Sequence, residues 1–156
     1  MKAIATAITL LLLTGSLPAS EALAAGSGRD APVPAQPAAV PSPEQEYNRG
    51  LSAKAAKNWS AAVASFQKAV SMKPAYPEAW NELGYALRNQ GRYPESLQAY
   101  DEALRLRPNF PEALEYLGEA YVKLGRVDDA RKVLERLKPL DAARATELSE
   151  AIEKGR

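Results

Sequence analysis

The chain has 156 residues and a formal net charge of +1, from 20 basic and 19 acidic side chains that are interspersed. Binding to nucleic acid needs a concentrated basic surface, so nucleic acid is not an expected partner. The lack of Cys and His removes thiolate nucleophiles, disulfides, imidazole bases and the usual zinc ligands. We therefore expect no catalytic, cofactor-binding or metal-binding residues and no enzyme.

Residues 1–24 have the build of a secretory signal peptide. Lys2 supplies one positive charge, an apolar run extends through about Leu13, and the sequence ALA at 22–24 fits the A-x-A cleavage rule. An uncleaved anchor would need about 20 apolar residues, and this run is shorter and interrupted before Pro18. The sequence predicts cleavage after 22–24, no stable membrane insertion of the mature chain, and a periplasmic or secreted location.

Residues 25–42 are rich in Pro and Ala and contain little to bury. Such a segment cannot recover the entropy lost on ordering, so we expect a disordered linker. The alternative, a proline-rich ligand for another domain, lacks a supporting aromatic or charged flank.

The stretch PEAWNELGYALRNQGRY from Pro77 is followed 34 residues later by a similar stretch, PEALEYLGEAYVKLGRV from Pro111. A frame moved back by the same interval reveals a third copy, which divides this region into units at 43–76, 77–110 and 111–144. Each unit opens with Pro-Glu, which suits a first helical turn, and breaks at its midpoint. The pattern predicts helix, tight turn and helix, three times.

These units resemble the tetratricopeptide repeat (TPR). The residues that match its preferred places are Gly50, Ala53, Ala62, Phe66, Ala69 and Pro74 in the first unit, Trp80, Leu83, Gly84, Tyr100, Ala103 and Pro108 in the second, and Leu114, Leu117, Gly118, Tyr121 and Ala130 in the third. The resemblance implies an all-α fold, a right-handed α-solenoid of three helical hairpins. A C-terminal helix at 145–156, with a narrow apolar stripe, is expected to cap the stack.

Packing follows from this alignment. Gly84 and Gly118 are expected where the two helices of a hairpin approach closely. In the first unit Glu46 and Arg49 stand where large apolar residues are expected, so its start should fray or be covered by another segment. Pro139 falls early in the third unit, which predicts a shorter second helix there.

In TPR proteins the stacked first helices line a concave groove, and the resemblance transfers this role to particular side chains. The candidate partner-binding residues are Tyr47, Leu51, Lys54, Asn81, Tyr85, Arg88, Asn89, Glu115, Glu119 and Lys123. The remaining groove places of the family hold Glu44, Ala55, Glu78, Glu112 and Val122.

An alternative explains part of this pattern without a ligand. The acids lie in first helical turns at Glu44, Glu78 and Glu112, and the bases lie in last turns, where both favour the helix dipole. Tyr47, Asn81 and Tyr85 have no such explanation, and exposed aromatic and amide groups are typical of peptide contacts.

Chaperone-binding members of the family hold a terminal carboxylate with Lys, Asn and Arg. The matching places here hold Tyr47, Leu51, Glu82, Glu112 and Tyr116. An acidic chaperone tail is therefore not the expected ligand.

The sequence favours a non-enzymatic adaptor of the bacterial cell envelope, monomeric rather than homo-oligomeric, that binds a peptide or helical segment of a protein partner in its groove. The alternative is a structural protein that self-associates by end-to-end stacking through its weak first unit. A third hypothesis, catalysis by the Ser-x-x-Lys spacing of Ser65 and Lys68, is disfavoured because Phe66 between them is a core position.

Overall fold

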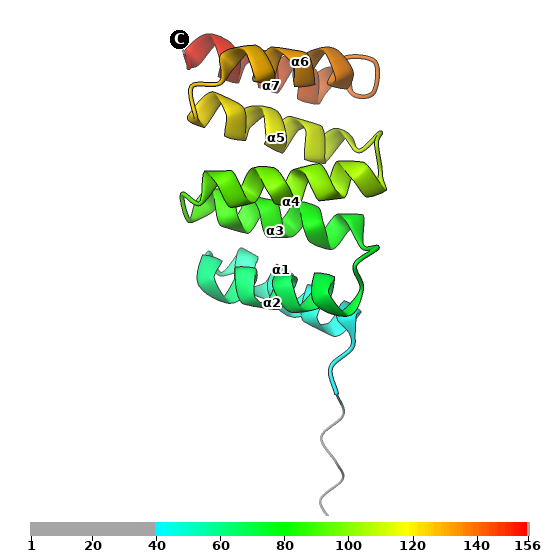
Figure 1. Ribbon diagram of the computed structural model, residues 1–156. Helices are drawn as coiled ribbons and strands as arrows, with labels where there is room; N and C mark the ends of the chain where they lie inside the picture. Colours follow the sequence, from blue (N-terminus) through cyan, green and yellow to red (C-terminus); the bar gives the residue numbers. More distant parts are fainter. Residues whose placement is uncertain (1–39, 156) are drawn as a thin grey trace, which may run out of the picture. The chain divides into compact units, whose positions relative to one another are not determined.

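The computed structural model describes residues 40–155, and seven helices occupy most of this range (Figure 1). They are α1 (Pro43–Ala55), α2 (Trp59–Met72), α3 (Pro77–Asn89), α4 (Tyr93–Leu106), α5 (Pro111–Lys123), α6 (Val127–Leu137) and α7 (Ala142–Lys154). No strand occurs in this range. The predicted signal peptide and most of the predicted linker lie outside the described residues. Between residues 40 and 155, no helix combines the length and the apolar character that a membrane span requires.

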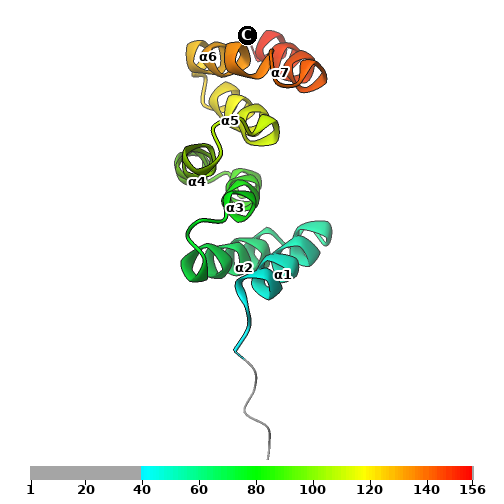
Figure 2. The ribbon, with the colours of Figure 1, turned by 90° about the vertical axis from the view of Figure 1, so that its right-hand side faces the viewer.

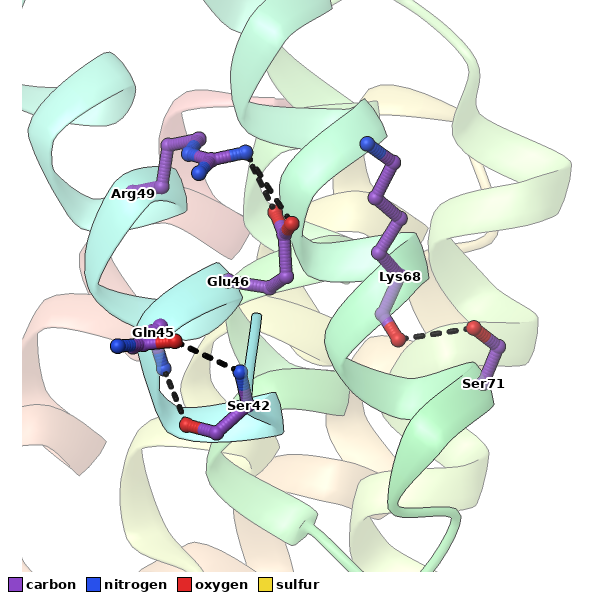
Figure 3. Close-up of polar contacts among 6 residues, drawn as sticks. All are labelled: Ser42, Gln45, Glu46, Arg49, Lys68 and Ser71. Atoms are coloured by element: carbon purple, nitrogen blue, oxygen red, sulfur yellow. Dashed lines mark hydrogen bonds and ion pairs between the residues drawn. The ribbon is translucent and has the colours of Figure 1, made fainter. Parts of the chain in front are cut away.

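The first helix begins with a capping box that the sequence predicts. The backbone N–H of Gln45 donates to Ser42 Oγ at 3.2 Å, and the backbone N–H of Ser42 donates to Gln45 Oε1 at 2.8 Å (Figure 3). Pro43 follows the cap, where its missing N–H costs no helical hydrogen bond. The start of α1 is therefore held in place locally.

The turns inside the three hairpins share a left-handed residue at the same place in each unit. Gly91 has φ 77° and Gly125 has φ 70°, and the residue 34 places before Gly91 is Lys57 with φ 54°. Glycine adopts this conformation without steric cost, whereas a side chain there costs roughly 1 to 2 kcal/mol. The turn between α1 and α2 is therefore the least favourable of the three.

The helices form two layers (Figure 2). Helices α1, α3, α5 and α7 make one, which we call the inner layer, and α2, α4 and α6 make the other. Each helix packs against the next one in the chain, and within the inner layer α1 contacts α3, α3 contacts α5, and α5 contacts α7. Each predicted unit thus contains one packed helical pair.

The end of the stack differs from the repeating part. Helix α6 has 11 residues against 14 in α2 and α4, which confirms the shortening predicted from Pro139. Helix α7 begins at Ala142, three residues before the boundary at 145 that the repeat spacing suggests. Asp141 caps α7, because its side chain accepts a hydrogen bond from the backbone N–H of Arg144 at 3.0 Å.

Two apolar clusters fill the space between the layers, one over α2 and α3 and the other from α4 to α7. Trp80 packs against both clusters and so connects them. The largest fully buried aromatic side chains are Phe66 and Tyr100, and their rings lie on Gly50 and Gly84. The expected close approach within the hairpin is therefore present at Gly84, where an added Cβ would lie 2.6 Å from the Tyr100 ring.

Gly118 makes a different contact from the one expected. A Cβ there would lie 2.5 Å from the side chain of Leu148, so its nearest neighbour is α7 and not the second helix of its own hairpin. Leu134 stands 34 residues after Tyr100, and its shorter side chain leaves space that Leu148 fills. Leu148 is fully buried, so α7 is part of the core as well as a cap.

The first unit buries an acid where the second unit has the partly buried Trp80 and the third has the buried Leu114. Glu46 is 2% exposed, and its carboxylate accepts from Arg49 Nη1 at 3.1 Å (Figure 3). The Lys68 side chain extends from α2 beside this pair, and Ser71 donates to the Lys68 carbonyl at 2.8 Å (Figure 3). Arg49 is the exposed member of the pair and so places a charge at this end of the stack.

Candidate partner-binding groove

The candidate residues lie on α1, α3 and α5 of the inner layer. We call the surface formed by the inner-layer helices the groove. A pocket of about 580 Å³ opens at the carboxyl ends of α3, α5 and α7. It is lined by Arg88, Asn89, Tyr93, Glu119, Val122, Lys123, Ala151, Lys154 and Gly155. The structure thus brings together the groove residues predicted from the last turns of the second and third units.

Three ion pairs join neighbouring helices of the inner layer. Lys54 Nζ on α1 lies 2.7 Å from Glu82 Oε2 on α3. Arg88 on α3 pairs with Glu119 on α5, and Glu115 on α5 pairs with Arg144 on α7. These predicted groove charges therefore have partners within the chain, and they bind adjacent helices to one another.

An aromatic cluster lies among these charges. The ring centroid of Tyr85 is 5.0 Å from that of Tyr116 and 6.0 Å from that of Trp59. Lys54 Nζ lies 4.4 Å from the Tyr85 centroid, and Arg88 Cζ lies 5.3 Å from it. Cations at these distances are attracted to the ring face. Tyr85 is half-buried and belongs to neither apolar cluster, so its ring contributes to the groove surface.

Tyr47 takes a more structural position than the sequence suggests. Its ring centroid lies 5.8 Å from that of Phe66 and 5.1 Å from that of Tyr76, and it packs against the core over α2 and α3, as does Leu51. Burial, together with the nearby carboxylate of Glu82, raises the pKa of Tyr47 to about 12. The expectation that Tyr47 lies outside the core is therefore wrong.

Asn81 and Glu115 are buried, which corrects the expectation of exposed groove side chains at these two places. They are 1% and 4% exposed respectively, because α3 and α5 pack against each other along the inner layer. Burial raises the pKa of Glu115, and the ion pair with Arg144 opposes that rise. The amide oxygen of Asn81 has no hydrogen-bond partner among the described residues.

At the amino ends of the inner helices, two ion pairs repeat with the 34-residue period. Glu44 Oε1 lies 2.9 Å from Lys73 Nζ, and Glu78 pairs with Arg107. These pairs give both acids a structural role beyond the helix dipole. The next member of the series, Glu112, forms no ion pair in the described part of the chain. At the other side of the groove Asn89, Lys123 and Ala55 are exposed, while Val122 is half-buried.

Sequence reasoning missed Arg144, Tyr116 and Glu82 as parts of the groove. Arg144 lies in α7, outside the periodic pattern, so no aligned position in another unit points to it. Tyr116 and Glu82 occupy the sixth place of their units, where the sequence shows only that the family's carboxylate-binding residues are absent. Their role becomes visible once the neighbouring helices are placed.

Comparison with known proteins supports the repeat assignment. A family profile described as TPR repeat matches residues 50–91 and 84–125. Among curated proteins, none matches the sequence.

Similar solved structures include the TPR2B domain of yeast Sti1 in its pHsp70 complex, with a TM-score of 0.70, 18% identity, and coverage of 73% of this chain and 98% of that one. The Arabidopsis OM64 TPR domain has a TM-score of 0.69 and 18% identity, and covers 74% of this chain and 97% of its own. PcrH, in complex with the chaperone binding region of PopD, has a TM-score of 0.67 and 24% identity, with 72% and 89% covered. The helical part of this chain has the fold of a tetratricopeptide-repeat solenoid.

Proposed function

We propose that this protein is a non-enzymatic interaction module that binds a peptide or helical segment of a partner protein in the groove. The observation that carries the proposal is an aromatic cluster of three half-buried side chains, Tyr85, Tyr116 and Trp59. Lys54 and Arg88 lie over the ring of Tyr85. Aromatic and Arg side chains dominate the energetic centres of protein interfaces. The solved relatives support the same conclusion, since the Sti1 domain and PcrH were determined with protein partners.

End-to-end self-association, the alternative, has less support. At one end of the stack, the exposed Arg49 pairs with the buried carboxylate of Glu46. On the last two helices the exposed side chains pair with one another, as in Lys138 with Glu135 and Lys154 with Glu150. Stable association between copies normally buries an apolar centre, and these charged pairs do not supply one.

A photo-crosslinking amino acid placed at Tyr85 is expected to capture the partner in living cells of the source organism. The same amino acid at Gln98, an exposed position on α4, is the matched control and should capture it far less. With the captured partner purified, Tyr85→Ala should weaken its binding about thirtyfold, as at an interfacial hot spot. Calorimetry measures this loss, and Gln98→Ala should bind like the unaltered chain. Capture at Gln98 alone would place the partner on α4 and defeat the groove proposal.

We also propose that the protein acts in the bacterial cell envelope. The proposal rests on the apolar run, the single Lys2 and the ALA sequence at 22–24, which have the build of an export signal. The mature protein should begin at Ala25 or within a few residues of it. Intact-mass measurement of the protein from the envelope fraction tests this, and retention of residues 1–24 would contradict it.

A further inference from the structure

The pocket of about 580 Å³ at the carboxyl ends of α3, α5 and α7 has an excess of positive charge in its lining. Its cationic residues are Arg88, Lys123 and Lys154. Among the described residues that line it, only Glu119 is acidic. None of the places that hold a carboxylate in chaperone-binding TPR proteins lines this pocket, so it is distinct from that site.

The two lysines leave their charge available to a ligand. Lys123, in the last turn of α5, is exposed and forms no ion pair with another described residue. Lys154 pairs at 3.0 Å with Glu150, which lies four residues before it on the same helix, and both side chains are exposed. An exposed pair of this kind contributes little to stability, so a ligand can take the place of Glu150 at small cost.

Arg88 adds a cation that is held in place. Its side chain is 16% exposed, and its Cζ atom lies 5.3 Å from the ring centroid of Tyr85 and 5.2 Å from that of Tyr116. A guanidinium presents a planar fork of N–H donors. Within residues 40–155, the acceptor for Arg88 is the carboxylate of Glu119, which binds Nη1. A guanidinium that is fixed between rings and still has donors to offer is suited to a further carboxylate.

The helix ends at the pocket oppose an anion only in part. The carboxyl end of a helix is partly negative. The last carbonyl groups of α3 and α5, however, accept hydrogen bonds from the turns that follow. The backbone N–H of Arg92 donates to the Leu87 carbonyl at 3.0 Å, and that of Arg126 donates to the Tyr121 carbonyl at 2.8 Å. The cationic side chains therefore dominate the charge that a ligand meets.

Half-buried apolar and aromatic side chains complete the pocket, namely Val122, Ala151 and Tyr93. Its volume falls within the range of about 300 to 1,000 Å³ that is typical of ligand sites. The methylene groups of an acidic side chain can contact this apolar part while its carboxylate meets the cations. A small inorganic anion would leave the apolar part without a contact.

We propose that the partner segment places the carboxylate of an aspartate or glutamate side chain in this pocket, where it meets Arg88 and the two lysines. This inference rests on the proposed function, because it names the chemistry of the segment that the groove binds. Arg88 lies over the ring of Tyr85, so one segment can contact both the aromatic cluster and the pocket. Opposite charge at such a place contributes to the choice of partner.

Selection from a displayed library of random nonapeptides on the full chain tests the inference without a known partner. The peptides are fused to their carrier through their carboxyl ends, so that only side chains can supply a carboxylate. The peptides that bind should be enriched in Asp or Glu at one position. The strongest binder is then synthesised with an amidated carboxyl end, and its variant with Asn or Gln at that position should bind about tenfold more weakly in calorimetry.

The matched protein variants are two double substitutions that each remove two positive charges. Lys123→Gln with Lys154→Gln should weaken binding of the acidic peptide about tenfold, close to the affinity of its neutral variant. Lys68→Gln with Lys132→Gln removes exposed lysines from α2 and α6 of the other layer and should bind like the unaltered chain. Lys132, like Lys154, pairs with an acid on its own helix. Circular dichroism spectra identical to that of the unaltered chain establish that both variants fold.

The outcomes separate this inference from the proposed function. Peptides that bind through Tyr85 but show no acidic preference, or that bind equally to the two double variants, would overturn the inference and leave the groove function standing. Tight binding regained by the neutral peptide when its carboxyl end is left free would assign the pocket to a chain terminus, and would also overturn the inference. A library that yields no peptide sensitive to Tyr85→Ala would count against the groove function and against the inference with it.

Discussion

Replacing Tyr100 by alanine is expected to lower the free energy of unfolding by about 3 to 5 kcal/mol. The Tyr100 side chain is fully buried, its ring lies on Gly84, and its centroid is 6.2 Å from that of Tyr116. Its removal leaves a cavity between α3 and α4 that close-packed neighbours cannot fill completely. Urea unfolding followed by far-ultraviolet circular dichroism measures the loss.

The matched control is Tyr100→Phe, which keeps the ring and removes the hydroxyl. That hydroxyl is buried and has no hydrogen-bond partner among the described residues, and burial raises the pKa of Tyr100. Removing an unsatisfied buried polar group should leave stability unchanged or raise it by about 1 kcal/mol. If Tyr100→Phe were as damaging as Tyr100→Ala, the hydroxyl would have a partner and the packing argument would be wrong.

Leucine at Gly84 is expected to cost about 3 kcal/mol, and leucine at Gly118 about 1 kcal/mol. Both glycines are in helix interiors, so the gain in helix propensity is the same and cancels in the comparison. The difference arises from the neighbours. At Gly84 a new Cβ meets the rigid, buried ring of Tyr100, whereas at Gly118 it meets the end of the flexible Leu148 side chain on the last helix.

Thermal and urea unfolding of the two variants provide the test. The unaltered chain and a Gln98→Leu variant, on the exposed surface of α4, serve as references. Equal losses at both glycines would show that α7 is held as rigidly as the hairpin over Gly84, and a larger loss at Gly118 would reverse the assignment of neighbours.

Most of the fold could be predicted from sequence because its determinants recur at a fixed interval. The 34-residue period, the prolines that open the first helices and the apolar spacing all indicate the same hairpin. The contact of Gly84 with Tyr100 follows from this period. The contact of Gly118 does not, since it depends on α7, which the repeat alignment does not cover, and on the short side chain of Leu134 beside it.

The candidate site was less predictable, for a related reason. The period assigns each residue a place within its unit, but it does not say which side chain of the next unit is within reach. Asn81 and Glu115 occupy groove places, yet close packing of α3 and α5 buries them. Arg88 suits a last helical turn on sequence grounds alone, and only the structure shows its carboxylate partner, Glu119.

The two kinds of ion pair have different consequences for the order of the units. Glu44 with Lys73 and Glu78 with Arg107 are each contained within one unit, and would survive if the first and second units exchanged places. Arg88 would then face the first unit, where Asn48 stands at the place of Glu82 and Leu51 stands at the place of Glu119. The apolar places that hold neighbouring units together differ less, the main exceptions being Glu46 in the first unit and Leu134 in the third. The polar contacts of the groove therefore depend on the order of the units more than the apolar contacts do. A rearrangement of the repeats would change the binding surface more than it would change the core.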